Sequence, residues 1–268
     1  MIKMPCGAEA MEIKVKREGD YSFVEEGEGP PLILLHGLFG ALSNWRDVVL
    51  KFRSRYRVLI PMLPIYEKTG VKPSVSALAE FVKGFVDFKQ IQRATFLGNS
   101  LGGHVAQLYA LDHLETVEAL VLTGSSGLFE SGMGSTFPRR GNYTYIKERV
   151  QYTFYSPDTA TNELIDEVFD IVNDNYKTLR ILKIARAAQR QNLREKLDAL
   201  KVPVLLVWGL NDNITPAHVA HEFHKLLPNS TLRFIDHCGH AAMMEQPERF
   251  NEVLEEFLNK IHPLAKTA

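Results

Sequence analysis

Residues 94–104 read Ala-Thr-Phe-Leu-Gly-Asn-Ser-Leu-Gly-Gly-His, and this stretch decides the fold that the sequence predicts. Residues 95–97 are typical of the end of a buried strand, and a helix is predicted to follow the turn. Gly98 and Gly102 stand two residues before and two residues after Ser100, because side chains at those positions of a tight turn would collide with neighbouring backbone. The turn directs the hydroxyl of Ser100 outward above the sheet. Ser100 is therefore the candidate nucleophile.

The composition indicates a globular chain that acts on small molecules. With 268 residues, a net charge of -1 and 24% charged residues, the chain can bury one large core and has no broad basic face. We therefore expect no nucleic-acid partner. Residues 1–10 do not resemble a signal peptide and no apolar run is long enough to span a bilayer, so we expect no membrane association and a cytoplasmic location. Cys6 and Cys238 predict no disulfide framework.

Strand and helix patterns alternate over most of the chain, which favours an α/β fold. Helices are predicted to begin near Ser43 or Asn44, after Ser74 as N-cap, and after Thr215 with Pro216 in the first turn. A last helix with one apolar face ends the chain. The first two predicted strands form a pair at a sheet edge. Strands are predicted at residues 12–16, 21–24, 32–35, 56–60, 95–97, 119–122, 202–208 and 232–235.

The alternation stops in the middle of the chain. Residues 128–190 contain no strand pattern but carry glycines, aromatic residues and helical segments, so we predict an inserted cap over the sheet. The rest of the chain, residues 1–127 and 191–268, forms the predicted core domain. Side chains near the cap could line an apolar substrate pocket. The candidate pocket residues are Phe39, Met133, Phe137 and Tyr143.

A serine hydroxyl needs a base within hydrogen-bond reach and an acid that orients the base. His240 follows the last predicted strand in a Gly-His turn, and Asp212 follows a buried strand. The carboxyl ends of parallel strands meet at one sheet edge, where ligand sites form. His237 is the nearest alternative base and Asp236 the alternative acid. We predict Ser100, Asp212 and His240 as the catalytic residues.

These motifs resemble those of the α/β-hydrolase family, whose nucleophile elbow is Gly-x-Ser-x-Gly and whose chain order is nucleophile, acid, base. The resemblance covers most of the chain and implies a mostly parallel eight-stranded sheet flanked by helices, with an inserted helical cap. It also implies an oxyanion hole formed by the backbone N–H groups of Leu38 and Leu101. His36 is then expected to be structural, and neither a cofactor nor a metal is required.

Two groups within that family show the strongest likeness. The Gly-Asn-Ser-Leu-Gly-Gly elbow resembles that of carbon-carbon hydrolases acting on meta-cleavage products, whereas residues 36–40 resemble small carboxylesterases. Where the carbon-carbon hydrolases carry a substrate-binding cap arginine and a tryptophan after the catalytic histidine, this chain has Val168 and Ala241. We therefore predict hydrolysis of a small-molecule carboxylic ester through an acyl-enzyme on Ser100. A carbon-carbon hydrolase and a non-catalytic ligand-binding protein of the same fold are the alternatives.

Three further patterns bear on possible binding sites. Three histidines share one helix face at a spacing that could hold a metal, but without a carboxylate or cysteine signature we expect none. They are His218, His221 and His224. Three arginines recur every four residues and could clamp an anion or form an exposed stripe. They are Arg186, Arg190 and Arg194. Residues 60–66 depart from the Asp-x-Pro-Gly turn of many family members, which weakens any substrate analogy.

Overall fold

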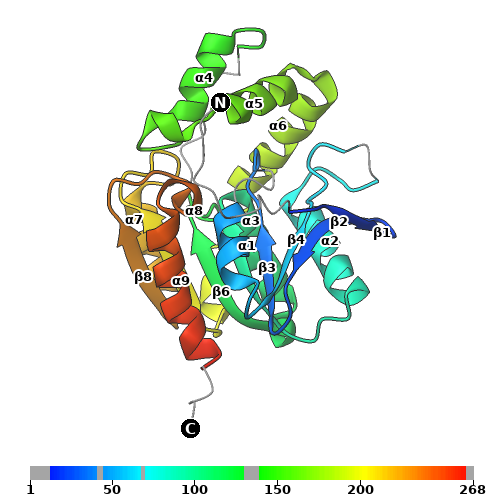
Figure 1. The fold of residues 1–268 in the computed structure, drawn as a ribbon, viewed down its shortest axis with the longest axis vertical. Helices are drawn as coiled ribbons and strands as arrows, with labels where there is room; N and C mark the ends of the chain where they lie inside the picture. Colours follow the sequence, from blue (N-terminus) through cyan, green and yellow to red (C-terminus); the bar gives the residue numbers. More distant parts are fainter. Residues whose placement is uncertain (1–12, 41–44, 68–69, 130–138, 264–268) are drawn as a thin grey trace, which may run out of the picture.

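The computed structural model describes residues 13–40, 45–67, 70–129 and 139–263, in which strands and helices alternate (Figure 1). The strands are β1 Lys16–Glu18, β2 Tyr21–Glu26, β3 Pro31–Leu35, β4 Arg57–Pro61, β5 Ala94–Asn99, β6 Val117–Thr123, β7 Val204–Gly209 and β8 Ser230–Ile235. The α-helices are α1 Arg46–Phe52, α2 Val75–Phe88, α3 Leu101–Asp112, α4 Tyr143–Gln151, α5 Asn162–Asn173, α6 Asn175–Arg190, α7 Ala217–Leu226, α8 Ala242–Glu245 and α9 Pro247–Ile261. Short 3₁₀ helices are η2 Leu114–Thr116, η3 Pro157–Thr159 and η4 Leu197–Ala199.

The strands form one eight-stranded sheet in the order β1-β2-β4-β3-β5-β6-β7-β8. The pairs β1–β2 and β2–β4 are antiparallel, and every other neighbouring pair is parallel. The predicted fold class and the predicted strand pair at the sheet edge are both confirmed. Parallel strands send their carboxyl ends to a common edge, and the segments after β3, β5, β6 and β7 therefore leave the sheet at the same edge.

Alternate residues of the central strands enter two different hydrophobic cores. In β3, Ile33 and Leu35 pack with the apolar residues of α2, α3 and α7. Leu32 and Leu34 pack with α1 and α9 on the opposite face. All four side chains are fully buried, and each contributes roughly 1.5–3 kcal/mol through its removal from water. Coverage on both faces explains the continuous apolar runs of these strands and holds the sheet edge in place.

Most predicted element boundaries shift by one or two residues, but the first strand was placed too early. The prediction was 12–16, whereas β1 is Lys16–Glu18. The position of β1 is set by the turn at Gly19, whose φ of +56° suits glycine and which pairs Glu18 with Tyr21. The predicted N-cap at Ser74 is confirmed, since its side chain accepts a hydrogen bond from the N–H of Ala77 at 3.2 Å.

The predicted N-cap at Thr215 is wrong. Helix α7 begins at Ala217, and Pro216 occupies the capping position without a side-chain hydrogen bond. The Thr215 hydroxyl instead donates to Asp212 Oδ2 at 2.7 Å, and a hydrogen bond to a charged carboxylate is stronger than one between neutral groups. At the other predicted helix start, Ser43 and Asn44 lie outside the described residues, and α1 begins at Arg46.

Helices α4, α5 and α6 follow one another between β6 and β7, and Figure 1 shows them together over one end of the sheet. We call residues 139–190, which contain these helices, the cap. Arg140 joins its first and last parts, because its guanidinium donates to Val172 O and to Asn175 Oδ1. The domain boundaries expected after residues 127 and 190 stay a prediction. Within the described ranges, no helix has the length and apolar character needed to cross a membrane.

Candidate active site

Ser100 occupies the corner between β5 and α3 with φ of +53° and ψ of −118°. A positive φ is costly for a residue with a side chain and is maintained by the structure around it. A Cβ on Gly98 would lie 2.5 Å from the backbone of Gly102, and one on Gly102 would lie 2.1 Å from the carbonyl oxygen of Leu35. Glycine is therefore required at both positions. The corner leaves Ser100 half-buried at the carboxyl edge of the sheet.

Asp212 and His240 form a buried hydrogen-bonded pair, with Oδ2 and Nδ1 2.8 Å apart. The second oxygen, Oδ1, accepts from the N–H groups of Ile214 at 2.7 Å and Thr215 at 2.9 Å. The Thr215 hydroxyl gives Oδ2 a further donor. An ionised carboxylate only accepts hydrogen bonds, so Nδ1 of His240 carries the proton and Nε2 of the neutral ring is left as an acceptor. This is the tautomer that a general base requires.

The elbow and the histidine loop are joined through the neighbours of Ser100 and His240. The side-chain amide of Asn99 donates to the carbonyl oxygens of Thr123 at 3.1 Å and His240 at 3.2 Å. Gly124 is the residue after Thr123 and has a φ of +51°. A Cβ on Gly124 would lie 2.7 Å from His240 O and 2.9 Å from His240 Nδ1. The ends of β5 and β6 therefore both contact the histidine, whose partner Asp212 follows β7.

Leu101 and Leu38 are the two residues expected to donate to an oxyanion. Leu101 is the first residue of α3, where N–H groups have no intrahelical acceptor and the helix dipole is positive. Gly37, the residue before Leu38, lies against the elbow, and a Cβ on it would be 3.3 Å from Ser100 Cβ. The role of Leu38 and Leu101 as oxyanion donors stays a prediction.

His36 ties the end of β3 to the loop after β4. Its Nε2 accepts from the N–H of Leu63 at 3.0 Å, and its Nδ1 lies 2.9 Å from Gly37 O, to which it donates. Burial lowers the pKa of His36 below its ordinary value, so the ring is neutral at pH 7 and can both donate and accept. These contacts fit the structural role expected for His36.

The alternative acid and base lie on the surface. Asp236 and His237 pair with each other at 3.4 Å, and both side chains are 66% exposed. The ring of His237 also packs edge-on against Tyr155, with ring centroids 5.2 Å apart. The structure thus brings Asp212, and not Asp236, to His240.

The cap is attached directly to the histidine loop. The N–H of His240 donates to Thr153 O at 2.9 Å, just after α4. The carboxylate of Glu245 accepts from the N–H of Ser156 at 2.6 Å through Oε1 and from the N–H of Gly239 at 2.5 Å through Oε2. One side chain on α8 therefore holds both the cap segment after α4 and the residue that precedes His240.

Comparison with known proteins agrees with this architecture. The model of the alpha/beta hydrolase family matches residues 32–253, which include the elbow, Asp212 and His240. The chain belongs to the alpha/beta hydrolase family.

Relatives of this hydrolase differ in the bonds that they are named for cleaving. It is 31% identical over 268 residues to a 2-hydroxy-6-oxo-6-(2'-aminophenyl)hexa-2,4-dienoic acid hydrolase from Metapseudomonas resinovorans, covering 92% of this chain and 90% of the relative. It is 24% identical over 282 residues to a monoacylglycerol lipase from Bos taurus, covering 94% and 83%. The crystal structure of an alpha/beta hydrolase enzyme from a sediment metagenome of the Mar Chica lagoon, Morocco, superposes with a TM-score of 0.76 at 42% identity, covering 92% and 98%.

The predicted pocket residues of the hydrolase have different surroundings. Met133 and Phe137 lie outside the described residues. Phe39 is partly buried and packs against both hydrophobic cores. Tyr143 is exposed at the contact between α4 and α5, where its hydroxyl donates to Asp166 Oδ1 at 2.7 Å. A role for these side chains in binding substrate stays a prediction.

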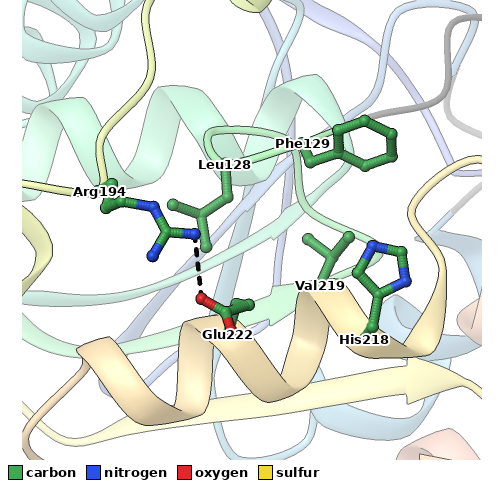
Figure 2. Close-up of a pocket in the computed structure, with 6 residues that line it drawn as sticks. All are labelled: Leu128, Phe129, Arg194, His218, Val219 and Glu222. Carbon is green, nitrogen blue, oxygen red and sulfur yellow. Dashed lines mark hydrogen bonds and ion pairs between the residues drawn. The ribbon is translucent and has the colours of Figure 1, made fainter.

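A cavity of about 210 Å³ lies beside α7 (Figure 2). Within it, the guanidinium of Arg194 is 3.0 Å from a carboxylate oxygen of Glu222, so this arginine is paired with an acid of the hydrolase itself. Arg186 and Arg190 are exposed on α6. The lining residues are Leu128, Phe129, Arg194, His218, Val219 and Glu222. The three predicted catalytic residues do not line this cavity.

The three histidines of α7 contact three different groups. The ring of His218 faces Phe129, with centroids 5.9 Å apart, and the ring of His221 lies 5.1 Å from that of Phe234. Nδ1 of His224 lies 2.8 Å from Ser230 Oγ. In the part of the chain that the structure describes, no three His, Cys, Asp or Glu side chains are grouped as metal ligands.

Thr215 is the site residue that sequence reasoning assigned to the wrong partner. The pattern Thr-Pro before a helix predicts an N-cap, and this obscured a second pattern. In Asp212-Asn-Ile-Thr215 the aspartate side chain can accept from backbone groups two and three residues ahead, as in an Asx turn. That local preference could have indicated that Asp212 is held by the segment that follows it.

Proposed function

We propose that this hydrolase uses Ser100, Asp212 and His240 as a catalytic triad to cleave carboxylic esters of small molecules. The observation that carries the proposal is the buried 2.8 Å pair of Asp212 and His240, whose hydrogen bonds require the tautomer that accepts a proton at Nε2. The strained backbone of Ser100 and the contact of Asn99 with the His240 backbone support the assignment of the nucleophile.

The proposed reaction has two steps and requires no cofactor. Ser100 Oγ attacks the ester carbonyl carbon while His240 Nε2 takes its proton. The tetrahedral oxyanion accepts hydrogen bonds from the N–H groups of Leu38 and Leu101, and losing one such donor typically costs about 3–4 kcal/mol. His240 then protonates the leaving alkoxide, which gives an alcohol and an acyl-enzyme. In the second step His240 deprotonates water, which attacks the acyl carbon. The bond from that carbon to Ser100 Oγ then breaks, His240 returns the proton to Oγ, and the carboxylic acid leaves.

The residues around the site favour an ester over a carbon-carbon bond. At the position where the sequence resemblance implies a substrate-binding arginine, Val168 is buried in an apolar cluster. Ala241 stands where that resemblance implies a tryptophan, and its side chain is also buried. The name of the 31%-identical relative makes carbon-carbon hydrolysis the second candidate. A dienoate substrate with an anionic end would need another cation of this chain to replace the arginine.

The proposal is tested by steady-state hydrolysis of p-nitrophenyl acetate, butyrate and octanoate, and of a 2-hydroxy-6-oxo-hexa-2,4-dienoate followed by its absorbance. A fluorophosphonate probe with mass spectrometry identifies the nucleophile. We expect ester turnover that Ser100→Ala abolishes, and phosphonate on Ser100. Turnover of the dienoate alone would establish the second candidate. Absence of both turnover and labelling would refute the serine-hydrolase assignment.

A further inference from the structure

The loop that follows β4 is held by a buried arginine of the cap. Arg180 lies on α6 and is only 7% exposed. Its Nε donates to Ile65 O at 2.9 Å, and Nη2 donates to Pro64 O at 2.8 Å. Both Nη atoms also lie 3.2 Å from Val71 O. A buried guanidinium requires such partners, because an unpaired charge away from water is strongly unfavourable.

The same loop reaches the segment that carries the expected oxyanion donor. The N–H of Leu63 donates to His36 Nε2 at 3.0 Å. Three residues later, the hydroxyl of Tyr66 donates a hydrogen bond to the carbonyl oxygen of Leu38. Burial raises the pKa of Tyr66 above its ordinary value, so its hydroxyl keeps its proton at neutral pH and remains a donor. The cap, the β4–α2 loop and residues 36–38 are thus connected through two sets of hydrogen bonds.

We propose that Tyr66 is a positioning residue for the oxyanion hole, and that Arg180 holds Tyr66 in place from the cap. The inference rests on the proposed function, in which the N–H of Leu38 stabilises the tetrahedral intermediate. Donors lower the barrier most when they are oriented before the charge develops. The hydrogen bond to Leu38 O limits rotation of the peptide units next to that N–H. Tyr66 therefore acts on the transition state through Leu38, and not by contacting substrate.

Tyr176 provides a matched control. It lies on α6, and its hydroxyl donates to Glu67 O at 3.3 Å, one residue beyond Tyr66 in the same loop. Tyr176→Phe removes one cap-to-loop hydrogen bond and the same hydroxyl group, but leaves Leu38 O with its partner. A purely structural role of the loop would make the two tyrosine variants alike, whereas the proposed role separates them.

The experiment compares Tyr66→Phe, Tyr176→Phe, Arg180→Met and Arg180→Lys in the full-length chain. Each is tested for kcat and KM on p-nitrophenyl butyrate, and for inhibition by a trifluoromethyl ketone, which forms a charged tetrahedral adduct with a serine. We expect Tyr66→Phe to lower kcat about 10- to 30-fold, less than the roughly 100- to 1,000-fold loss of a whole donor, with KM within about twofold. Inhibitor affinity should fall by the same factor. Tyr176→Phe should match the wild type.

The arginine variants test the second half of the inference. Arg180→Met should reproduce the kcat loss of Tyr66→Phe, and Arg180→Lys should recover part of it. Adding Arg180→Met to Tyr66→Phe should lower kcat little further, because Arg180 and Tyr66 both act through the β4–α2 loop. Wild-type kcat and inhibitor affinity in Tyr66→Phe would overturn the inference, as would a loss confined to KM or shared equally by Tyr176→Phe. If Tyr66→Phe does not fold, kcat and inhibitor affinity are measured for Arg180→Lys instead. A fall of both by the same factor supports the inference, and a fall of only one of them overturns it.

The wild-type protein separates this inference from the proposed function. Wild type without turnover that depends on Ser100 would refute both. An active wild type together with an equally active Tyr66→Phe refutes only the role of Tyr66.

Discussion

Replacing Asp212 by asparagine changes one atom of the candidate triad, and the structure dictates how the new amide would lie. Oδ1 accepts from the N–H groups of Ile214 and Thr215 at 2.7 and 2.9 Å. Two donors aimed at this position require an oxygen there. The amide nitrogen therefore takes the place of Oδ2 and faces His240 Nδ1, 2.8 Å away in the wild type. As a donor, it forces His240 to accept at Nδ1 and to carry its proton on Nε2.

The magnitude follows from the hydrogen bonds at that position. Turning the amide over would forfeit two backbone hydrogen bonds of about 1 kcal/mol each, a bias of about 2 kcal/mol, or roughly 30-fold, towards the unproductive tautomer. Unpaired N–H groups would increase this bias. A histidine with its proton on Nε2 cannot take the proton of Ser100. This tautomer bias alone lowers kcat about 30-fold, and losing the carboxylate that stabilises the His240 imidazolium lowers it further, so we expect the loss of about 10⁴ that is typical of this change in Ser-His-Asp enzymes.

Two assays check this reasoning. Ester hydrolysis at pH 7 measures the loss of kcat in Asp212→Asn, and ¹⁵N NMR of the His240 ring reports which nitrogen carries the proton without any substrate. Asp236→Asn is the control, because Asp236 is exposed and pairs with His237, and it should keep wild-type activity. A loss of kcat within about tenfold in Asp212→Asn, which is only about 1.4 kcal/mol, would contradict the predicted change of tautomer, as would a His240 that keeps its proton on Nδ1.

Three further changes test the surroundings of the site. Gly124→Ala adds a Cβ 2.9 Å from His240 Nδ1, at a residue whose φ is +51°. The value of kcat/KM should therefore fall by at least about tenfold, or about 1.4 kcal/mol. Unchanged ester hydrolysis by this variant would contradict the close contact between Gly124 and His240. Glu245→Gln replaces a carboxylate that accepts from two backbone N–H groups by an amide with one acceptor oxygen. Urea titrations should show an unfolding free energy lower by about 1.5–3 kcal/mol. Glu248 is exposed, and Glu248→Gln should not cause this loss. Burial lowers the pKa of His104 to about 4, so between pH 6.5 and 4 the unfolded chain binds more protons than the folded chain. The unfolding free energy should therefore fall by up to roughly 3 kcal/mol as the pH is lowered through that window. The same pH dependence of the unfolding free energy in wild type and His104→Gln would refute this.

How much of the site could be predicted from sequence depended on how local its signals are. The elbow was readable because its glycines and Ser100 lie within five consecutive residues, and the clashes that require glycine recur wherever a strand turns sharply into a helix. The chain order of Ser100, Asp212 and His240 was predicted from the resemblance to the α/β-hydrolase family, and Asp212 was chosen because parallel strands deliver the residues that follow them to one sheet edge. The placement of Asp212 against His240, and not of Asp236, could only be proposed, because both aspartates follow strands.

The sequence by itself determined the fold class, the burial of the central strands and the strand-turn-helix elbow, since each depends on periodicity or on a few adjacent residues. Only the tertiary structure decided the partners of Thr215, Glu245 and Tyr66. Thr215 donates to Asp212, Glu245 joins the cap to the residue before His240, and Tyr66 donates to the segment after β3. The hydrogen bonds between Ser156 and Glu245 and between Tyr66 and Leu38 join segments that are distant in the chain. Such segments come into contact only after the sheet has formed, so local sequence preferences do not predict these contacts.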